Sequence, residues 1–66
     1  MEEKWYNIEL SKEEWEDFRE VLKRDEKESG IHWYYEASEV GNWVHIEIKC
    51  MPSELHYLNE LLMKIF

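Results

Sequence analysis

The sequence is poor in the residues that build covalent cross-links and small-molecule sites. Cys50 is its only cysteine, so a framework of disulfides within the chain is excluded, and a single thiol is typical of a reducing compartment. Gly30 and Gly41 are its only glycines, which leaves no glycine-rich loop of the kind that cradles phosphates. No motif of an enzyme family is present.

Long hydrophobic runs are also missing. No apolar stretch approaches the roughly 18 residues that are needed to cross a bilayer. The first residues, MEEKWYNIEL, are acidic where a signal peptide is basic. We therefore expect a cytoplasmic protein with a single domain, residues 1–66, near the lower size limit for independent folding.

Positive charge is scarce as well. The chain has 8 Lys and Arg residues against 16 Asp and Glu residues, a net charge of -8. Nucleic-acid phosphates and anionic membranes are bound by clustered basic side chains, so we expect neither partner. Disorder is disfavoured, because aromatic residues make up 15% of the chain and the hydrophobic pattern is regular.

What is present is a clear pattern of secondary structure. Polar and apolar residues alternate over 4–10, which predicts a strand. Ser11 and Glu14 then have the spacing of a capping box, and the helix that follows is expected to end near Gly30, the usual left-handed terminator. The apolar stripe of this helix consists of Trp15, Phe18, Val21 and Leu22.

Residues 31–38 and 43–50 are expected to form a β-hairpin. Two registers would keep their apolar faces together. The sequence Gly41-Asn42 favours a tight two-residue turn, but this turn sets Glu36 opposite Glu47 and so creates a repulsive pair.

The alternative hairpin register uses a four-residue loop. It pairs Ala37 with Val44, which removes the repulsion and places Glu36 beside His45. We favour this second register.

A final helix is expected to open at Met51-Pro52, with proline at its preferred first position. Its apolar residues are Leu55, Leu58, Leu61, Leu62 and Ile65. The order β-α-β-β-α predicts an α+β open-faced sandwich, a three-stranded sheet with two helices on one face. This arrangement resembles a ferredoxin-like fold that lacks its last strand, a resemblance of topology that implies no function.

Such a fold leaves one sheet face bare, and aromatic side chains fall on it. The candidate partner-binding residues are Trp5, Tyr34, Trp43, His32 and His45. Exposed Trp and Tyr are typical of contact sites with another protein, either a second copy or a host protein. The plainer interpretation is that aromatics favour strands and are covered by long charged side chains.

The first helix carries a second candidate surface. Its acidic-surface residues are Glu13, Glu16, Asp17 and Glu20. A ridge of carboxylates can imitate the phosphates of DNA and occupy a nucleic-acid-binding groove. The alternative is a solvated face, since acids early and bases late in a helix suit its dipole.

Catalysis and metal binding are weakly supported. His32 and His45 share the bare face but are too far apart in the preferred register to share a metal ion, and His56 is expected at the surface. Cys50 ends the buried face of its strand, where a thiol is usually inert. We expect no enzyme activity, no metal and no cofactor.

The sequence therefore favours a small acidic interaction protein that acts by protein–protein binding, as a homodimer. A phage- or mobile-element-encoded inhibitor or adaptor of a host protein fits its size and charge. The alternative is a DNA-mimic inhibitor of a nucleic-acid-binding enzyme, and a structural subunit of a larger assembly comes third.

Overall fold

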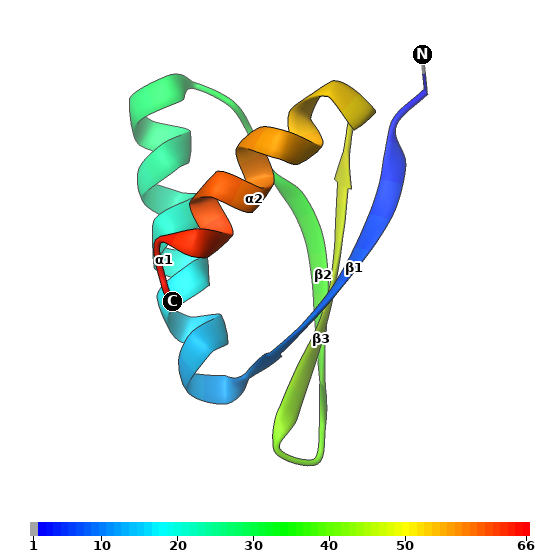
Figure 1. Ribbon diagram of the computed structural model, residues 1–66, viewed down its shortest axis with the longest axis vertical. Helices are drawn as coiled ribbons and strands as arrows, with labels where there is room; N and C mark the ends of the chain where they lie inside the picture. Colours follow the sequence, from blue (N-terminus) through cyan, green and yellow to red (C-terminus); the bar gives the residue numbers. More distant parts are fainter. Residues whose placement is uncertain (1) are drawn as a thin grey trace.

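Three strands and two helices make up the chain in the computed structural model, which describes residues 2–66 (Figure 1). The elements are β1 (Lys4–Ser11), α1 (Lys12–Ser29), β2 (Tyr34–Val40), β3 (Trp43–Cys50), a short 3-10 turn η1 (Pro52–Glu54) and α2 (Leu55–Met63). The predicted order β-α-β-β-α is confirmed.

The strands form one antiparallel sheet in the order β1-β3-β2. Both helices lie on the same side of this sheet, and no element formed by residues 2–66 covers its other side (Figure 1). The α+β open-faced sandwich that the sequence predicts is therefore the observed fold. Since β3 is central, β1 and β2 are the two edges of the sheet.

Helix α1 begins and ends where its capping residues require. The Glu14 N–H donates to Ser11 Oγ at 3.2 Å, and the Ser11 N–H donates to Glu14 Oε1 at 2.9 Å. This reciprocal pair confirms the predicted capping box. At the other end Gly30 adopts a left-handed φ of 77°, and its N–H donates to the Glu26 carbonyl at 3.0 Å.

The hairpin has the two-residue turn, so the register that we favoured from the sequence is wrong. Val40 pairs with Trp43 across the turn, and Glu36 lies opposite Glu47. Gly41 supplies a φ of 62°, the left-handed value that a tight type II′ turn needs at its first position.

The physical reason is the number of residue pairs that each turn allows. Because Trp33 is hydrogen-bonded to α1 and β2 starts at Tyr34, the two-residue turn gives seven cross-strand pairs, whereas the four-residue loop would give five. One like-charge pair costs only about 0.2–1 kcal/mol, which the added ladder hydrogen bonds and side-chain pairs offset.

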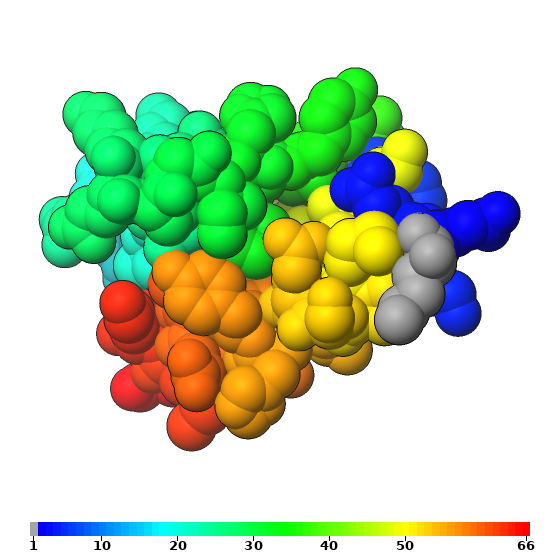
Figure 2. Space-filling model, turned by 90° about the horizontal axis from the view of Figure 1, so that it is seen from above, coloured from blue at the N-terminus to red at the C-terminus, as the bar shows by residue number. Residues whose placement is uncertain are grey.

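The segment before β2 is not part of the sheet, although the sequence predicts a strand from residue 31. The Trp33 N–H donates to Glu26 Oε1 at 3.2 Å, so this backbone is tied to α1 and β2 starts at Tyr34. Viewed from its upper end, the molecule shows this green segment packed against the orange helix α2 (Figure 2).

The core lies between the helices and the inner face of the sheet. Its buried apolar residues are Leu10, Trp15, Phe18, Leu22, Trp33, Val44, Ile46, Ile48, Cys50, Leu58 and Leu61. Ala37 lies opposite the buried Ile46 but is itself exposed, because β2 is an edge strand.

Candidate functional site

The face of the sheet that the helices leave uncovered, called the bare face below, is built from four rows of residues. Each row takes one residue from β1, one from β3 and one from β2, in that order. The rows are Ser11, Trp43 and Val40; Glu9, His45 and Ser38; Asn7, Glu47 and Glu36; and Trp5, Lys49 and Tyr34. Each of the two outer rows, called the apolar rows below, therefore has two large apolar side chains, and the two rows between them contain only polar residues.

Trp5 and Tyr34 form one apolar end of the bare face. Their rings meet edge to face, with centroids 6.1 Å apart and planes at 69°. Lys49 lies between them on β3, with its Nζ 5.9 Å from the centre of the Trp5 ring, a cation–π distance. Trp5 remains 43% exposed and Tyr34 57% exposed.

A hollow lies beside this aromatic pair, with a volume of about 420 Å³. It is lined by Glu3, Trp5, His32, Tyr34, Glu36 and Lys49. A basic, two acidic and two aromatic side chains are thus within reach of a single bound group.

Trp43 and Val40 form the other apolar end, beside the turn. They are 56% and 65% exposed, and with Glu9 and His45 they line a hollow of about 210 Å³. Trp43 and Lys49 are at opposite ends of β3, so the two apolar rows are about 20 Å apart at the usual rise per residue. The structure therefore does not join the three predicted aromatic residues into one patch.

The middle of the bare face is acidic. His45 lies between two carboxylates, with Nδ1 3.8 Å from Glu9 Oε1 and Nε2 3.7 Å from Glu47 Oε1. The predicted pairing of Glu36 with His45 is wrong, because the observed register sets Ser38 opposite His45. Within residues 2–66, no basic side chain lies within 4.0 Å of the Glu36 carboxylate.

His32 lies outside the sheet, on the segment that precedes β2. Its Nδ1 is 3.7 Å from Glu26 Oε2, and its ring lines the hollow beside Tyr34. It does not approach His45. No group of three or more potential metal ligands comes together in the described part of the chain.

The acidic ridge of α1 is exposed as the sequence predicts, at Glu13, Glu16, Asp17 and Glu20. The next turns of the same helix carry Lys23, Arg24 and Lys27, and these basic residues share a shallow hollow with Glu20. The line of negative charge on α1 therefore ends halfway along the helix.

A buried carboxylate that the sequence analysis missed joins the two helices. Asp25 is only 7% exposed, and its Oδ2 accepts hydrogen bonds from Trp33 Nε1 at 2.9 Å and from Ser29 Oγ at 3.3 Å. Its Oδ1 accepts a hydrogen bond from the Tyr57 hydroxyl on α2. The Trp33 and Tyr57 rings stack over one another at 6.1 Å.

These hydrogen bonds determine the charge state of Asp25. Burial acts to raise the pKa of this carboxyl, but the hydrogen bonds from Tyr57, Trp33 and Ser29, helped by the charge of Lys64, outweigh burial and leave the pKa below its ordinary value. The same contact to Asp25 raises the pKa of the Tyr57 hydroxyl. Asp25 is thus a buried anion held by neutral donors.

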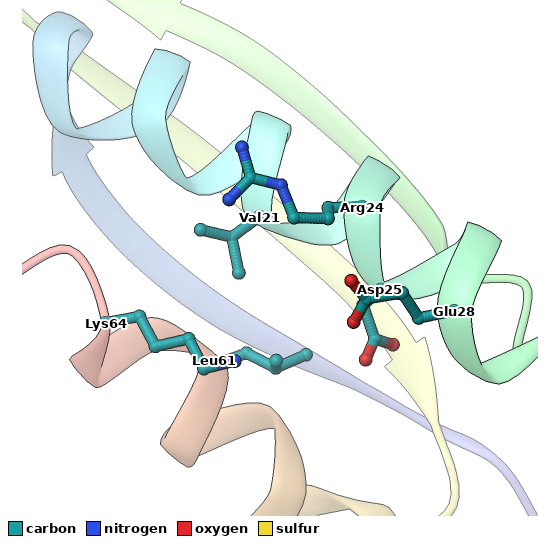
Figure 3. Close-up of a pocket in the computed structure, with 6 residues that line it drawn as sticks. All are labelled: Val21, Arg24, Asp25, Glu28, Leu61 and Lys64. Atoms are coloured by element: carbon teal, nitrogen blue, oxygen red, sulfur yellow. The ribbon is translucent and has the colours of Figure 1, made fainter.

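The space around Asp25 is too small for a ligand. A cleft of about 50 Å³ lies between α1 and α2, lined by Val21, Arg24, Asp25, Glu28, Leu61 and Lys64 (Figure 3). Among the described residues, no buried side-chain nitrogen or oxygen lacks a hydrogen-bond partner. Asp25 is therefore a structural joint. Its position three residues after Leu22, in the apolar stripe of α1, is the sequence signal that could have revealed it.

Cys50 is buried at the end of β3, as the sequence predicts. Burial, followed by the charges of Glu54 and Glu3, raises the pKa of its thiol. A thiol that stays protonated and buried is a poor nucleophile and a poor metal ligand.

No protein-family model, curated protein or solved structure matches this chain. Across residues 2–66, neither helix has the length and apolar character that a membrane span requires.

Proposed function

We propose that this chain is a protein-binding module and that the bare face is its contact surface. One observation supports the proposal above all. Trp5, Tyr34, Trp43 and Val40 are all between 43% and 65% exposed, and all lie on the face that the helices do not cover. Large exposed aromatic residues are enriched at the energetic centres of protein interfaces.

Strand propensity alone accounts for these residues less well. The Lys49 side chain covers part of the Trp5 ring, as it would on a solvated face. Among residues 2–66, Lys49 over Trp5 is the one cation–π contact, and Trp43 has none; its neighbour in the row, Val40, is the more exposed of the two. Adjacent exposed apolar side chains of this kind are more typical of a contact site than of a solvated face.

The partner is better identified as another protein than as a second copy of this chain. Face-to-face pairing about a two-fold axis would bring the acidic middle of one bare face against the acidic middle of its copy. Like charges that are desolvated together oppose association. A partner with its own charge pattern has no such conflict.

Affinity capture with the tagged chain tests the proposal. The variant Trp5→Thr/Tyr34→Thr/Trp43→Thr keeps strand propensity and removes the aromatic surface. Met63→Thr/Phe66→Thr is the matched control, because these two side chains are exposed to 72% on the helical side. We expect a defined protein, identified by mass spectrometry, to be retained by the wild type and the control and lost by the triple variant. Retention by the triple variant would refute the proposal.

The acidic ridge of α1 supports a second candidate function, mimicry of DNA phosphates. Its four carboxylates are exposed, and within the described chain none forms an ion pair. In this case the captured protein would bind nucleic acid and be released by salt. Its retention would survive loss of the aromatic residues but not neutralisation of Glu13, Glu16, Asp17 and Glu20.

A further inference from the structure

The two polar rows of the bare face carry an unbalanced charge. They hold Glu9, Glu47 and Glu36, and the only basic group between these acids is the imidazole of His45. His45, on the central strand β3, lies between Glu9 of β1 and Glu47 of β3. On the β2 side, Glu36 lies directly opposite Glu47, with no basic side chain of the described chain beside it.

The one lysine of the bare face does not correct this imbalance. Lys49 is in the next row, between Trp5 and Tyr34, and its ammonium group lies over the Trp5 ring. Directly opposed residues of an antiparallel pair have Cβ atoms only about 5 Å apart, so Glu36 and Glu47 repel each other. A positive group placed above both would relieve this repulsion.

The surroundings of Glu36 suit one kind of positive group in particular. Tyr34 precedes Glu36 by two residues on the same face of β2, and both side chains line the 420 Å³ hollow. A guanidinium group can stack on an aromatic ring and donate two parallel hydrogen bonds to carboxylates. Lysine offers a point charge without the planar stacking surface.

On the basis of the proposed function, we propose that the bare face binds a basic segment of a partner protein. Apolar side chains of that segment contact the two apolar rows, and an arginine side chain lies over Glu36 and Glu47, against the Tyr34 ring. A second copy that paired through the same bare face would present the same carboxylates, so the charge of this face favours a foreign partner over face-to-face pairing. The partner segment is thus basic, contains an arginine, and binds the bare face that is proposed above as the contact surface.

The spacing of the rows defines a peptide probe. In an extended peptide, side chains on one face repeat every second residue, like the rows of the sheet. A heptapeptide with leucine at both ends and arginine two residues before the second leucine places its three side chains over the Trp43, Glu47 and Lys49 rows. The same peptide with citrulline, the neutral isostere of arginine, is the control.

Binding of both peptides to the intact chain is measured by tryptophan fluorescence, with Trp5 and Trp43 as the exposed reporters, and by amide shifts in NMR. We expect the arginine peptide to bind about tenfold more tightly than the citrulline peptide, which corresponds to the lower end of the net gain from a hydrogen bond to a charged group. In Glu36→Gln/Glu47→Gln this preference should fall to near unity. The variant Glu16→Gln/Glu20→Gln, which removes the same charge from α1, should keep most of it.

The outcomes separate this inference from the proposed function. Equal binding of the two peptides to the wild type would overturn the arginine subsite. If Trp43→Thr then weakened both peptides alike, the aromatic contact surface would still be supported. An equal loss of preference in the Glu16/Glu20 variant would show a diffuse charge effect and overturn the inference. Failure of the arginine peptide to bind at millimolar concentration, or self-association that buries the tryptophans, would also overturn it, and affinity capture would still test the proposed function.

Discussion

Asp25 and the Glu36–Glu47 pair are carboxylate groups on opposite sides of one small sheet, and their surroundings differ in every respect. Asp25 is buried among the helices and accepts hydrogen bonds from Trp33, Ser29 and Tyr57. The two glutamates face solvent across a strand pair, opposite each other.

The difference separates folding from binding in this chain. A carboxylate without donors could not be tolerated between the helices, because an unpaired buried charge costs several kcal/mol. On the bare face, solvent screens the repulsion, so an unfavourable pair can be kept at small cost. The inner side of the sheet thus stabilises the fold, and the outer side is left with charges that a partner can satisfy.

The largest expected effect comes from the inner face of β3. Ile46 is fully buried in the core, so Ile46→Ala removes packed volume and leaves a cavity. We expect a loss of about 2–5 kcal/mol in the free energy of unfolding, enough to unfold a domain of this size. Urea titration followed by circular dichroism measures it. A loss below about 1 kcal/mol would mean that the core is not as tightly packed as the structure shows.

The second-largest loss of stability is expected at Asp25, which connects the two helices. Asp25→Asn keeps the shape of the side chain, but its amide nitrogen cannot accept, so either Trp33 Nε1–H or the Tyr57 hydroxyl loses its acceptor. We expect the free energy of unfolding to fall by about 1–3 kcal/mol. The urea midpoint of the variant at neutral pH checks this. An unchanged midpoint would show that Asp25 does not hold the helices together.

The loss of stability in Asp25→Asn should depend on pH. Because the folded pKa of Asp25 is below its ordinary 3.8, the anion stabilises the fold above that pH, and this stability is lost as the pH falls through the folded pKa. The stability gap between wild type and Asp25→Asn should therefore be constant near neutral pH and narrow below about pH 4. Urea midpoints of both proteins at a series of pH values measure the gap. The other carboxyl groups titrate alike in the two proteins, so their contributions cancel in the difference. A gap that stays constant in acid would contradict the shift.

The fold was accessible from local sequence signals. The capping box at Ser11 and Glu14, the glycine after α1 and the alternation of β1 and β3 each depend on residues close together in the chain, and each was predicted correctly. The hairpin register was not predicted correctly, because it depends on the balance between one like-charge repulsion and the two cross-strand residue pairs that the tighter turn adds. The sequence shows which charges can lie opposite each other, but it does not give the summed energy of the cross-strand hydrogen bonds and side-chain pairs.

The candidate site was only partly predictable for a related reason. Strand periodicity places Trp5, Tyr34 and Trp43 on the bare face, but their separation along the face follows from how β1 and β2 align with β3. That alignment joins Trp5 to Tyr34 and puts Trp43 at the far end. Asp25 was missed because its donors, Trp33 and Tyr57, come from distant segments that only the tertiary fold brings together.

A much smaller effect on stability is expected on the bare face. Trp43 is 56% exposed, so Trp43→Thr should change the free energy of unfolding by no more than about 0.5 kcal/mol. The same substitution should strongly reduce partner capture. A urea titration and a capture experiment on one preparation test both parts. A loss of stability comparable to that of Ile46→Ala would indicate that Trp43 serves the fold, and the contrast between the two faces would fail.

The smallest expected effect has the opposite sign. Glu36→Gln removes the repulsion with Glu47, so the isolated chain should become more stable by a few tenths of a kcal/mol, within the range of about 0.2–1 kcal/mol for cross-strand pairs.

A double-mutant cycle with Glu47→Gln isolates this coupling between the two glutamates, measured as shifts of the urea midpoint at low ionic strength, where charge effects are least screened. The second neutralisation should add little once the first has been made. Additive gains would show that both glutamates respond to the net charge of -8 rather than to each other. A variant that gains stability while losing its preference for the arginine peptide would show that the Glu36–Glu47 pair serves binding, because Glu36 lies opposite Glu47 and, among residues 2–66, has no basic side chain within 4.0 Å.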